Sequence, residues 1–398
     1  MPCVSKSYSQ IRGGVFSDAR DRRLKACRVW SMQSVDNALE ASRFGPTQRI
    51  IQIHPTLRCN LTCTHCYSDS GPTAETALDQ ATLCRVLSDA SLMGYSVASF
   101  SGGEPLLYKE LERVLAHAKS CGMRTTVTSN GTLFTRERLR RLKEVVDVLA
   151  ISLDGPPDLH NQIRNSPSAF DHLVAGLDHV RGAGITFGFI HTLTRQSWEH
   201  LIWLTEFAHD QGASLLQLHP LELTGRAEQR MPGQWPEDDT LARAYLLTLA
   251  LAAKYETKMS IQLDVYHREY LLEHAEMVYA SERGWPPEGQ PAAELLSPLV
   301  VQADGLVVPL CYGFSENYSV CDLKRETLAE SWPRYVRRGY PAFRALCLKV
   351  FEDVMAPHHE LPFLNWYELI VARSRAPASI AHIDSSLPHD SPVATRSC

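Results

Sequence analysis

The stretch that decides the fold is VASFSGGEPLLYKELERVLAHAKSCGMRTTVT, residues 97–128. It begins with a short β-rich run at 97–100 and ends with another at 124–128. Between them lies a helical pattern whose apolar side chains share one face: Leu111, Val114, Leu115 and Ala118. This helix is expected to stop before Gly122. A strand, a helix and a second strand within roughly 30 residues form a βαβ unit, which predicts parallel strands covered by a helix.

The same order recurs through the first half of the chain. Further β-rich runs are predicted at 49–54, 148–153, 185–191 and 215–218. Helical faces of the same kind stop at Gly94, at a break from Gly182 to Gly184, and at Gly212. Six βα units suffice for an open barrel. The predicted fold class is therefore α/β, an open partial (β/α)6 TIM-like barrel.

The rest of the chain departs from this alternation. A polar, proline-broken stretch at 225–239 precedes a helix expected at 241–255 and a strand-like run at 260–265. Runs at 299–302 and 306–310 flank Ala303-Asp304-Gly305, which predicts a hairpin. We predict five segments: an N-terminal extension (1–46), the barrel (47–230), a helical connector (231–296), a small module (297–350), and a C-terminal helix with a mobile tail beyond Ser374 (351–398).

Composition excludes several classes of protein. The chain has 398 residues, of which 44% are hydrophobic and 21% charged, close to the globular average, with a net charge of −5. No apolar run is long enough to span a bilayer, and the first twenty residues carry no apolar signal core. We therefore expect a cytoplasmic protein with no membrane partner. The net negative charge gives no overall field for nucleic acid, which we do not expect as a partner.

Three of the eleven cysteines crowd into Cys59-Asn-Leu-Thr-Cys63-Thr-His-Cys66. The cluster follows the first strand, and βα barrels keep their active sites in the loops at the carboxyl ends of strands. In a reducing compartment such crowding indicates metal or redox chemistry. Three thiolates can hold three irons of a 4Fe–4S cluster and leave the fourth iron open. A zinc site, with His65 or a distant cysteine as fourth ligand, is the alternative.

The CxxxCxxC spacing of Cys59, Cys63 and Cys66 resembles that of radical S-adenosylmethionine (radical SAM) enzymes, with His65 where an aromatic ring is usual. Ser101-Gly102-Gly103-Glu104-Pro105 looks like the GGE segment of that family. The resemblance implies an enzyme, an oxidoreductase or maturase, with a 4Fe–4S cluster and S-adenosylmethionine as cofactors. It would cleave the cofactor reductively to a 5'-deoxyadenosyl radical that abstracts hydrogen from a substrate. The three cysteines would be its catalytic metal ligands.

The resemblance also implies a cofactor-binding set. By family position it comprises His65, Gly102, Gly103, Glu104, Ser129, Asn130, Ser152, Asp154 and Arg164. Gly102, Gly103 and Glu104 would hold the cofactor's ammonium group, and Arg164 would lie near its carboxylate. The serines, Asn130 and Asp154 would line its ribose and methionine side. Ordinary turn chemistry is the alternative for these segments. The stretch 221–227 also resembles a family segment near the cofactor and is expected only as lining.

The segments 302–311 and 327–332 resemble the opening of the SPASM or twitch module of peptide- and cofactor-maturing members. This resemblance implies a small C-terminal α+β cap after the barrel. A full SPASM set has seven cysteines, whereas only Cys311, Cys321 and Cys347 follow here, so the module is degenerate. These three thiols would hold one auxiliary Fe–S cluster, or they are small buried apolar groups.

The resemblance favours a ribosomally made peptide as substrate, modified by a cross-link or at a side chain. A small molecule or a tetrapyrrole or other cofactor precursor is the alternative substrate. A non-catalytic metal-binding protein is a remote third interpretation. The electron would come from a donor such as flavodoxin or ferredoxin.

Overall fold

The computed structural model describes residues 49–281, 290–356 and 362–376. The predicted N-terminal extension and the chain beyond residue 376, which includes nearly all of the predicted tail, lie outside these residues.

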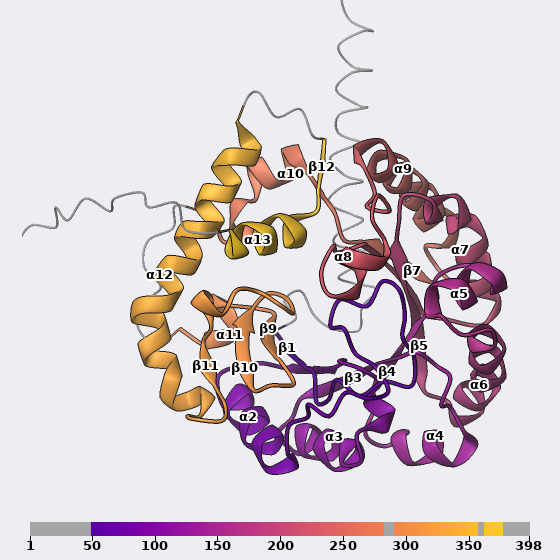
Figure 1. Cartoon of the computed structure of the whole chain (residues 1–398), viewed down its shortest axis with the longest axis horizontal. Coiled ribbons are helices and arrows are strands. Elements are labelled where there is room, and N and C mark those ends of the chain that lie inside the picture. Colours follow the sequence, from indigo (N-terminus) through magenta and orange to yellow (C-terminus); the bar gives the residue numbers. More distant parts are fainter. Residues whose placement is uncertain (1–48, 282–289, 357–361, 377–398) are drawn as a thin grey trace, which may run out of the picture.

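Seven parallel strands form the centre of the molecule, in sequence order across the sheet. They are β1 (Ile50–Ile53), β2 (Val97–Phe100), β3 (Arg124–Ser129), β4 (Val148–Ser152), β5 (Thr186–Leu193), β6 (Leu215–Pro220) and β7 (Ser260–Leu263). Because all seven run the same way, their carboxyl ends meet at one edge, and the loops that follow them share that edge (Figure 1).

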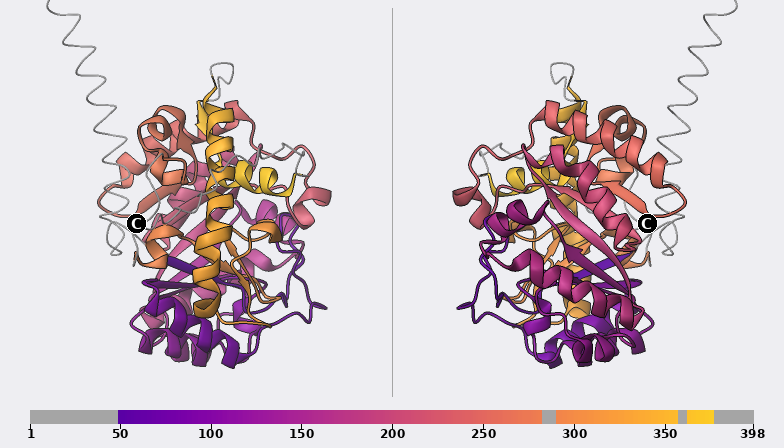
Figure 2. Two further views of the ribbon diagram at one scale, coloured as in Figure 1. Left: turned by 90° about the vertical axis from the view of Figure 1, so that its left-hand side faces the viewer. Right: turned by 90° about the vertical axis from the view of Figure 1, so that its right-hand side faces the viewer.

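Helices cover the outer face of this curved sheet (Figures 1 and 2). They are α2 (Gln80–Leu92), α3 (Leu111–Ser120), α4 (Arg136–Leu142), α5 (Pro157–Arg164), α6 (Ala169–Ala183), α7 (Leu201–Asp210) and α9 (Asp238–Tyr255). The short helix α8 (Arg226–Arg230) lies instead on the inner side of the curve (Figure 1). The α/β open-barrel prediction is confirmed. The break expected from Gly182 onward occurs later, because α6 continues through Gly182 and ends where Gly184 takes a left-handed φ of +68°.

Residues alternate along the barrel strands between the helices and the interior. In β1, Ile51 and Ile53 are fully buried under the helices, whereas Gln52 lines a cavity inside the barrel. The same period places Thr126 and Gln217 on the cavity side of β3 and β6. Closed TIM barrels fill this space with layers of branched apolar side chains. Here the interior holds a cavity that is lined by both polar and apolar side chains.

The C-terminal region extends the same sheet. The predicted hairpin is present as β9 (Leu299–Val301) and β10 (Leu306–Pro309), joined by β11 (Cys321–Asp322). β9 pairs in parallel with β1, so ten strands form one sheet in the order β11-β10-β9-β1-β2-β3-β4-β5-β6-β7. The predicted connector contributes β7 to this sheet, and the five-segment division remains a prediction.

A long helix, α12 (Leu328–Met355), flanks the β9–β11 side of the sheet (Figure 1). It begins with a capping box formed by Thr327 and Glu330, and its buried face packs against α2 and α13 (Trp366–Arg375). It runs through residue 350, where we expected a module boundary. The smaller elements are β8 (Tyr266–His267), α10 (Arg268–Glu273), α11 (Ala292–Leu295) and β12 (Phe363–Leu364). None of the helices in the described part of the chain has the length and apolar character needed to cross a membrane.

Candidate active site

The three clustered cysteines lie in the loop after β1, at the carboxyl edge of the sheet. Cys59 and Cys63 are buried and Cys66 is half-buried. Each sulfur lies near one N–H donor: Asn130 Nδ2 is 3.9 Å from Cys59 Sγ, Arg164 Nη1 is 3.7 Å from Cys63 Sγ, and the Ser70 backbone N is 3.3 Å from Cys66 Sγ. Donors directed at sulfur favour the thiolate over the thiol.

Burial has the opposite effect on the same groups. It raises the pKa of the Cys59 thiol to about 12, and it also raises the pKa of Cys63. Buried thiols of this kind ionise readily only against a positively charged centre, such as a metal cluster.

The donor set fits an iron–sulfur cubane. Within residues 49–281, 290–356 and 362–376, no group of three His, Cys, Asp or Glu side chains is arranged to hold a single metal ion. A cubane makes a different demand, because each of three thiolates binds its own iron. Three thiols on one loop, each with an N–H donor, meet that demand and would leave one iron without a protein ligand.

Two glycines let the loop after β2 lie directly against the cysteine loop. The Gly103 backbone N donates to Thr56 O at 2.8 Å, and a Cβ at Gly103 would come within 2.3 Å of Arg58 O. Gly102 has a φ of +111°, and a Cβ there would lie 2.7 Å from Thr56 O. Close packing of main chain on main chain therefore requires both glycines, in addition to any ligand that they contact.

The segment after β6 holds the opposite side of the cysteine loop. Arg226 donates from Nη1 to Cys63 O at 3.0 Å and from Nη2 to Ser70 O at 2.6 Å. A Cβ at Gly225 would lie 2.3 Å from Tyr67 O, so this contact too needs a glycine. Sequence analysis expected only lining from 221–227 and missed Arg226, because nothing local to it indicates a partner more than 150 residues earlier.

Glu104 is the first of two buried carboxylates that hold neighbouring groups of the site in place. Its carboxylate is fully buried and accepts hydrogen bonds from Leu106 N at 3.1 Å, Ser129 Oγ at 2.9 Å and Asn130 N at 2.8 Å. Burial raises the pKa of Glu104 despite these donors. The carboxylate thus fixes the end of β3, and through it the Asn130 side chain beside Cys59. Contact with the cofactor's ammonium group, implied by the resemblance, stays a prediction.

Asp154 is the second fully buried carboxylate. Arg164 donates from Nε to Oδ2 at 2.6 Å and from Nη2 to Oδ1 at 3.2 Å, and His65 Nε2 lies 3.1 Å from Oδ1. Burial alone would raise the pKa of Asp154, but Arg164, followed by His65 and His160, holds it well below its usual range. The pair fixes the guanidinium whose third nitrogen reaches the Cys63 sulfur.

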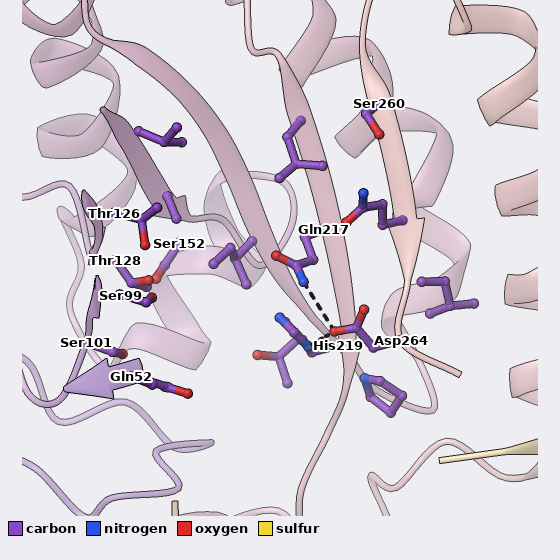
Figure 3. Close-up of a pocket in the computed structure, with 18 of the residues that line it drawn as sticks. Gln52, Ser99, Ser101, Thr126, Thr128, Ser152, Gln217, His219, Ser260 and Asp264 are labelled. Carbon is purple, nitrogen blue, oxygen red and sulfur yellow. Dashed lines mark hydrogen bonds and ion pairs between the residues drawn. The ribbon is translucent and has the colours of Figure 1, made fainter. Parts of the chain in front are cut away.

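A cavity of about 1910 Å³ brings most of the predicted residues together. Those that line it are Cys59, Cys63, His65, Cys66, Gly102, Gly103, Ser129, Asn130, Ser152 and Arg164. Glu104 and Asp154 do not line the cavity; they hold residues that do. The cavity continues into the barrel along the polar faces of the strands (Figure 3). Its volume is larger than the roughly 300 to 1,000 Å³ of ordinary ligand pockets.

The three C-terminal cysteines have different surroundings. Cys347 is fully buried in α12 within the main core, and Cys321 is buried in β11 near Ser331. Cys311 lines the cavity and faces the charges of Glu222, Arg375 and Glu368. These placements favour the alternative of small packing groups for Cys321 and Cys347. The auxiliary cluster stays a prediction that the structure does not test.

Comparison with known proteins finds a family model that matches part of the barrel. Residues 53–208 match the model of the Radical SAM superfamily. The chain is 31% identical over 176 residues to Fe-coproporphyrin III synthase of Methanosarcina barkeri, covering 44% of each chain. It is 29% identical over 188 residues to AdoMet-dependent heme synthase of Oleidesulfovibrio alaskensis, covering 46% of this chain and 48% of that one. The chain thus spans less than half the length of these two relatives.

The fold is similar to that of Streptococcus suis SuiB. The structure of SuiB bound to S-adenosylmethionine superposes with a TM-score of 0.59 at 18% identity, covering 75% of this chain and 68% of that one. The structure with precursor peptide SuiA gives a TM-score of 0.59 at 14% identity, covering 87% and 75%. The SPASM subgroup remains a prediction. Residues 53–208 thus match the Radical SAM superfamily, and the fold is similar to that of a protein solved with bound S-adenosylmethionine.

Proposed function

We propose that this protein cleaves S-adenosylmethionine reductively and uses the product radical to abstract hydrogen from a substrate. One observation carries the proposal: three thiols on one loop, each with its own N–H donor, line a cavity large enough for a cofactor and a substrate. A 4Fe–4S cluster held by Cys59, Cys63 and Cys66 would supply the electron for this reductive cleavage.

The tasks of the protein follow from its own contacts. Asn130, Arg164 and the Ser70 backbone stabilise the three thiolates by N–H···S contacts. Gly102 and Gly103 leave main chain open to the cavity at the end of β2, where a ligand's polar groups can approach. The buried carboxylate of Glu104 holds Asn130 in place, and that of Asp154 holds Arg164, so that these two donors need no reorganisation when a ligand binds.

For the substrate we propose a ribosomally made peptide, with a cofactor precursor of tetrapyrrole type as the second candidate. Similarity of fold to SuiB, which has been solved with a precursor peptide, supports the peptide. The names of the sequence relatives, Fe-coproporphyrin III synthase and heme synthase, support the tetrapyrrole. Both inferences are by analogy.

The proposal is tested with protein reconstituted anaerobically with iron and sulfide. Wild type is expected to bind iron and acid-labile sulfide and, with dithionite as electron donor, to convert S-adenosylmethionine to 5'-deoxyadenosine and methionine. Cys59→Ala, Cys63→Ala and Cys66→Ala should each abolish this cleavage. Cys84→Ala is the matched control, because Cys84 lies on α2, away from the cavity lining. Full cleavage by any of the three variants, or by iron-free wild type, refutes the proposal.

The substrate class is tested by hydrogen transfer. Candidate precursor peptides and iron-coproporphyrin III, each deuterated at carbon, are incubated with the reconstituted enzyme. Deuterium in 5'-deoxyadenosine identifies the class whose C–H bond is broken. Transfer from the tetrapyrrole and none from the peptides would replace the peptide proposal with its alternative.

A further inference from the structure

Two titratable side chains lie side by side on the cavity wall at β6 and β7, in a part of the site that the functions above do not use. β6 and β7 pair in parallel with Leu218 opposite Leu263, and Asp264 N donates to Leu218 O at 2.9 Å. The next residues along the chain are His219, in β6, and Asp264, directly after β7, and both line the cavity. His219 Nδ1 forms an ion pair with Asp264 Oδ2.

The carboxylate is itself held in place. Gln217, two residues before His219 on the same face of β6, donates from Nε2 to Asp264 Oδ2 at 3.3 Å. Figure 3 shows Gln217, His219 and Asp264 together on one wall, across from a second wall that carries Ser99, Ser101, Thr126, Thr128 and Ser152. The imidazole ring is thus oriented by a fixed partner on its Nδ1 side.

The other nitrogen of the ring has room for a ligand. The His219 side chain is 43% exposed, and this exposure is toward the cavity that it lines. Among the described residues, no hydrogen-bond partner is found for Nε2. An imidazole with one nitrogen bound by a carboxylate and the other directed to a ligand space is the usual arrangement of a proton-transfer group.

The charges around the ring set its protonation. Asp264 from β7 and Glu222 from the loop after β6 are the charged groups that face it. Burial opposes the charged imidazole, but the charge and hydrogen bond of Asp264, with the charge of Glu222, together raise the pKa of His219 above its ordinary value. The raised pKa means that the ring holds a proton more readily than a free imidazole does.

We propose that His219 exchanges a proton with the substrate through Nε2, and that Asp264 is the positioning residue that holds its ring. The substrate would carry an N–H, O–H or S–H group near the carbon that loses hydrogen. In this step the substrate's X–H bond breaks, its electron pair stays on X, and the proton moves to Nε2; cavity water later takes the proton. No electron changes hands. The inference rests on the proposed function in that this cavity holds the substrate.

The first test needs no substrate. Full-length reconstituted protein is treated with diethyl pyrocarbonate, which modifies only neutral imidazole, from pH 5 to 8, and modification of His219 is followed by peptide mass. We expect the inflection for wild type to lie above about pH 6.5. It should fall by about one unit or more in Asp264→Asn, because an opposite charge in contact accounts for about 1 to 3 units. Asp264→Glu should restore much of the shift.

The matched control is Glu269→Gln, because Glu269 lines the same cavity and is not among the groups that shift the pKa of His219. It should leave the inflection in place. An unmodified His219, or an inflection that Asp264→Asn does not move, overturns the proposal.

The second test uses whichever deuterated compound transfers label. His219→Gln should lower kcat by about 10²-fold or more and remove the pH inflection, with KM changed little. Wild-type turnover by this variant overturns the proposal. Failure of wild type to cleave S-adenosylmethionine is a separate result, which refutes the proposed function and leaves the modification experiment valid.

Discussion

The buried pair of Arg164 and Asp154 offers the sharpest test of how the site is held together. Asp154 is fully buried, the Arg164 side chain is 8% exposed, and two N–H···O contacts of 2.6 and 3.2 Å join them. Removing one partner of such a pair leaves an uncompensated buried charge, which costs about 3 to 5 kcal/mol. We therefore expect Arg164→Met to lower the free energy of unfolding by about that amount, a large part of the roughly 5 to 15 kcal/mol available.

A second substitution separates charge from packing. Asp154→Asn keeps a carbonyl that His65 can contact and removes the charge. If the cost of Arg164→Met arises from the orphaned carboxylate, the double variant should lose about 2 kcal/mol less than Arg164→Met alone. The assay is urea unfolding of wild type, both single variants and the double variant at pH 7. A cost below about 1 kcal/mol for Arg164→Met, or no recovery in the double variant, refutes the reasoning.

The same pair predicts how the stability difference between wild type and Arg164→Met changes with pH. The pKa of Asp154 is depressed in the folded protein, so its contribution is fully present above the unfolded value of about 3.9 and is lost as the pH falls through the folded value. The stability gap between wild type and Arg164→Met should thus be full at pH 7 and narrow only in acid. A gap that does not narrow on acidification would assign the effect to another group.

Three further predictions concern the same edge of the sheet. Gly103→Ala should lower the iron content and reduce the free energy of unfolding by more than about 2 kcal/mol, because its Cβ would lie 2.3 Å from Arg58 O. Gly182→Ala, whose Cβ would have nothing within 4 Å, should instead raise the free energy of unfolding by about 0.5 to 1 kcal/mol. Thermal unfolding and iron analysis compare the two variants. Arg226→Met removes two hydrogen bonds from a charged donor and should cost about 1.5 to 3 kcal/mol, with loss of bound iron while α3 and β3 stay protected in hydrogen exchange. Burial lowers the pKa of His191 to about 4, below the value of about 6.5 in the unfolded chain. The free energy of unfolding of wild type should therefore fall as the pH drops from about 6.5 to 4, by up to about 1.4 kcal/mol per pH unit. His191→Gln should flatten this slope in urea titrations.

The local elements were predictable because each carries its own periodicity. The β-rich runs at 97–100 and 148–153 alternate or cluster apolar residues, and the helix faces repeat at three and four residues, so β2, β4 and α3 lie where the pattern indicates. The pairing of β9 with β1 was not predictable in this way. It joins residues 299–301 to 51–53, and no local signal encodes a contact across that separation.

For the site, the sequence indicated which residues are involved better than it indicated what each residue contacts. Spacing alone indicated the three thiols, and family resemblance added Glu104 and Asp154. Their carboxylates lie behind the cavity wall, and their contact with the cofactor stays a prediction. The pairing of His219 with Asp264 was not predictable from the sequence, because it depends on the register of β6 against β7.

The loop that bears the thiols is held from several strands at once, and this bears on how the site can change. Main-chain contacts come from the end of β2, the Asn130 amide from β3, the Arg164 guanidinium from the helix after β4, and Arg226 from the segment after β6. Because these contacts converge on one loop, thiol geometry depends on the strands keeping their relative positions. The polar cavity face of β5 to β7 takes no part in those contacts. Substitutions there can alter substrate binding without disturbing the thiols, which is why the His219 and Asp264 variants can report on a later step than the cysteine variants do.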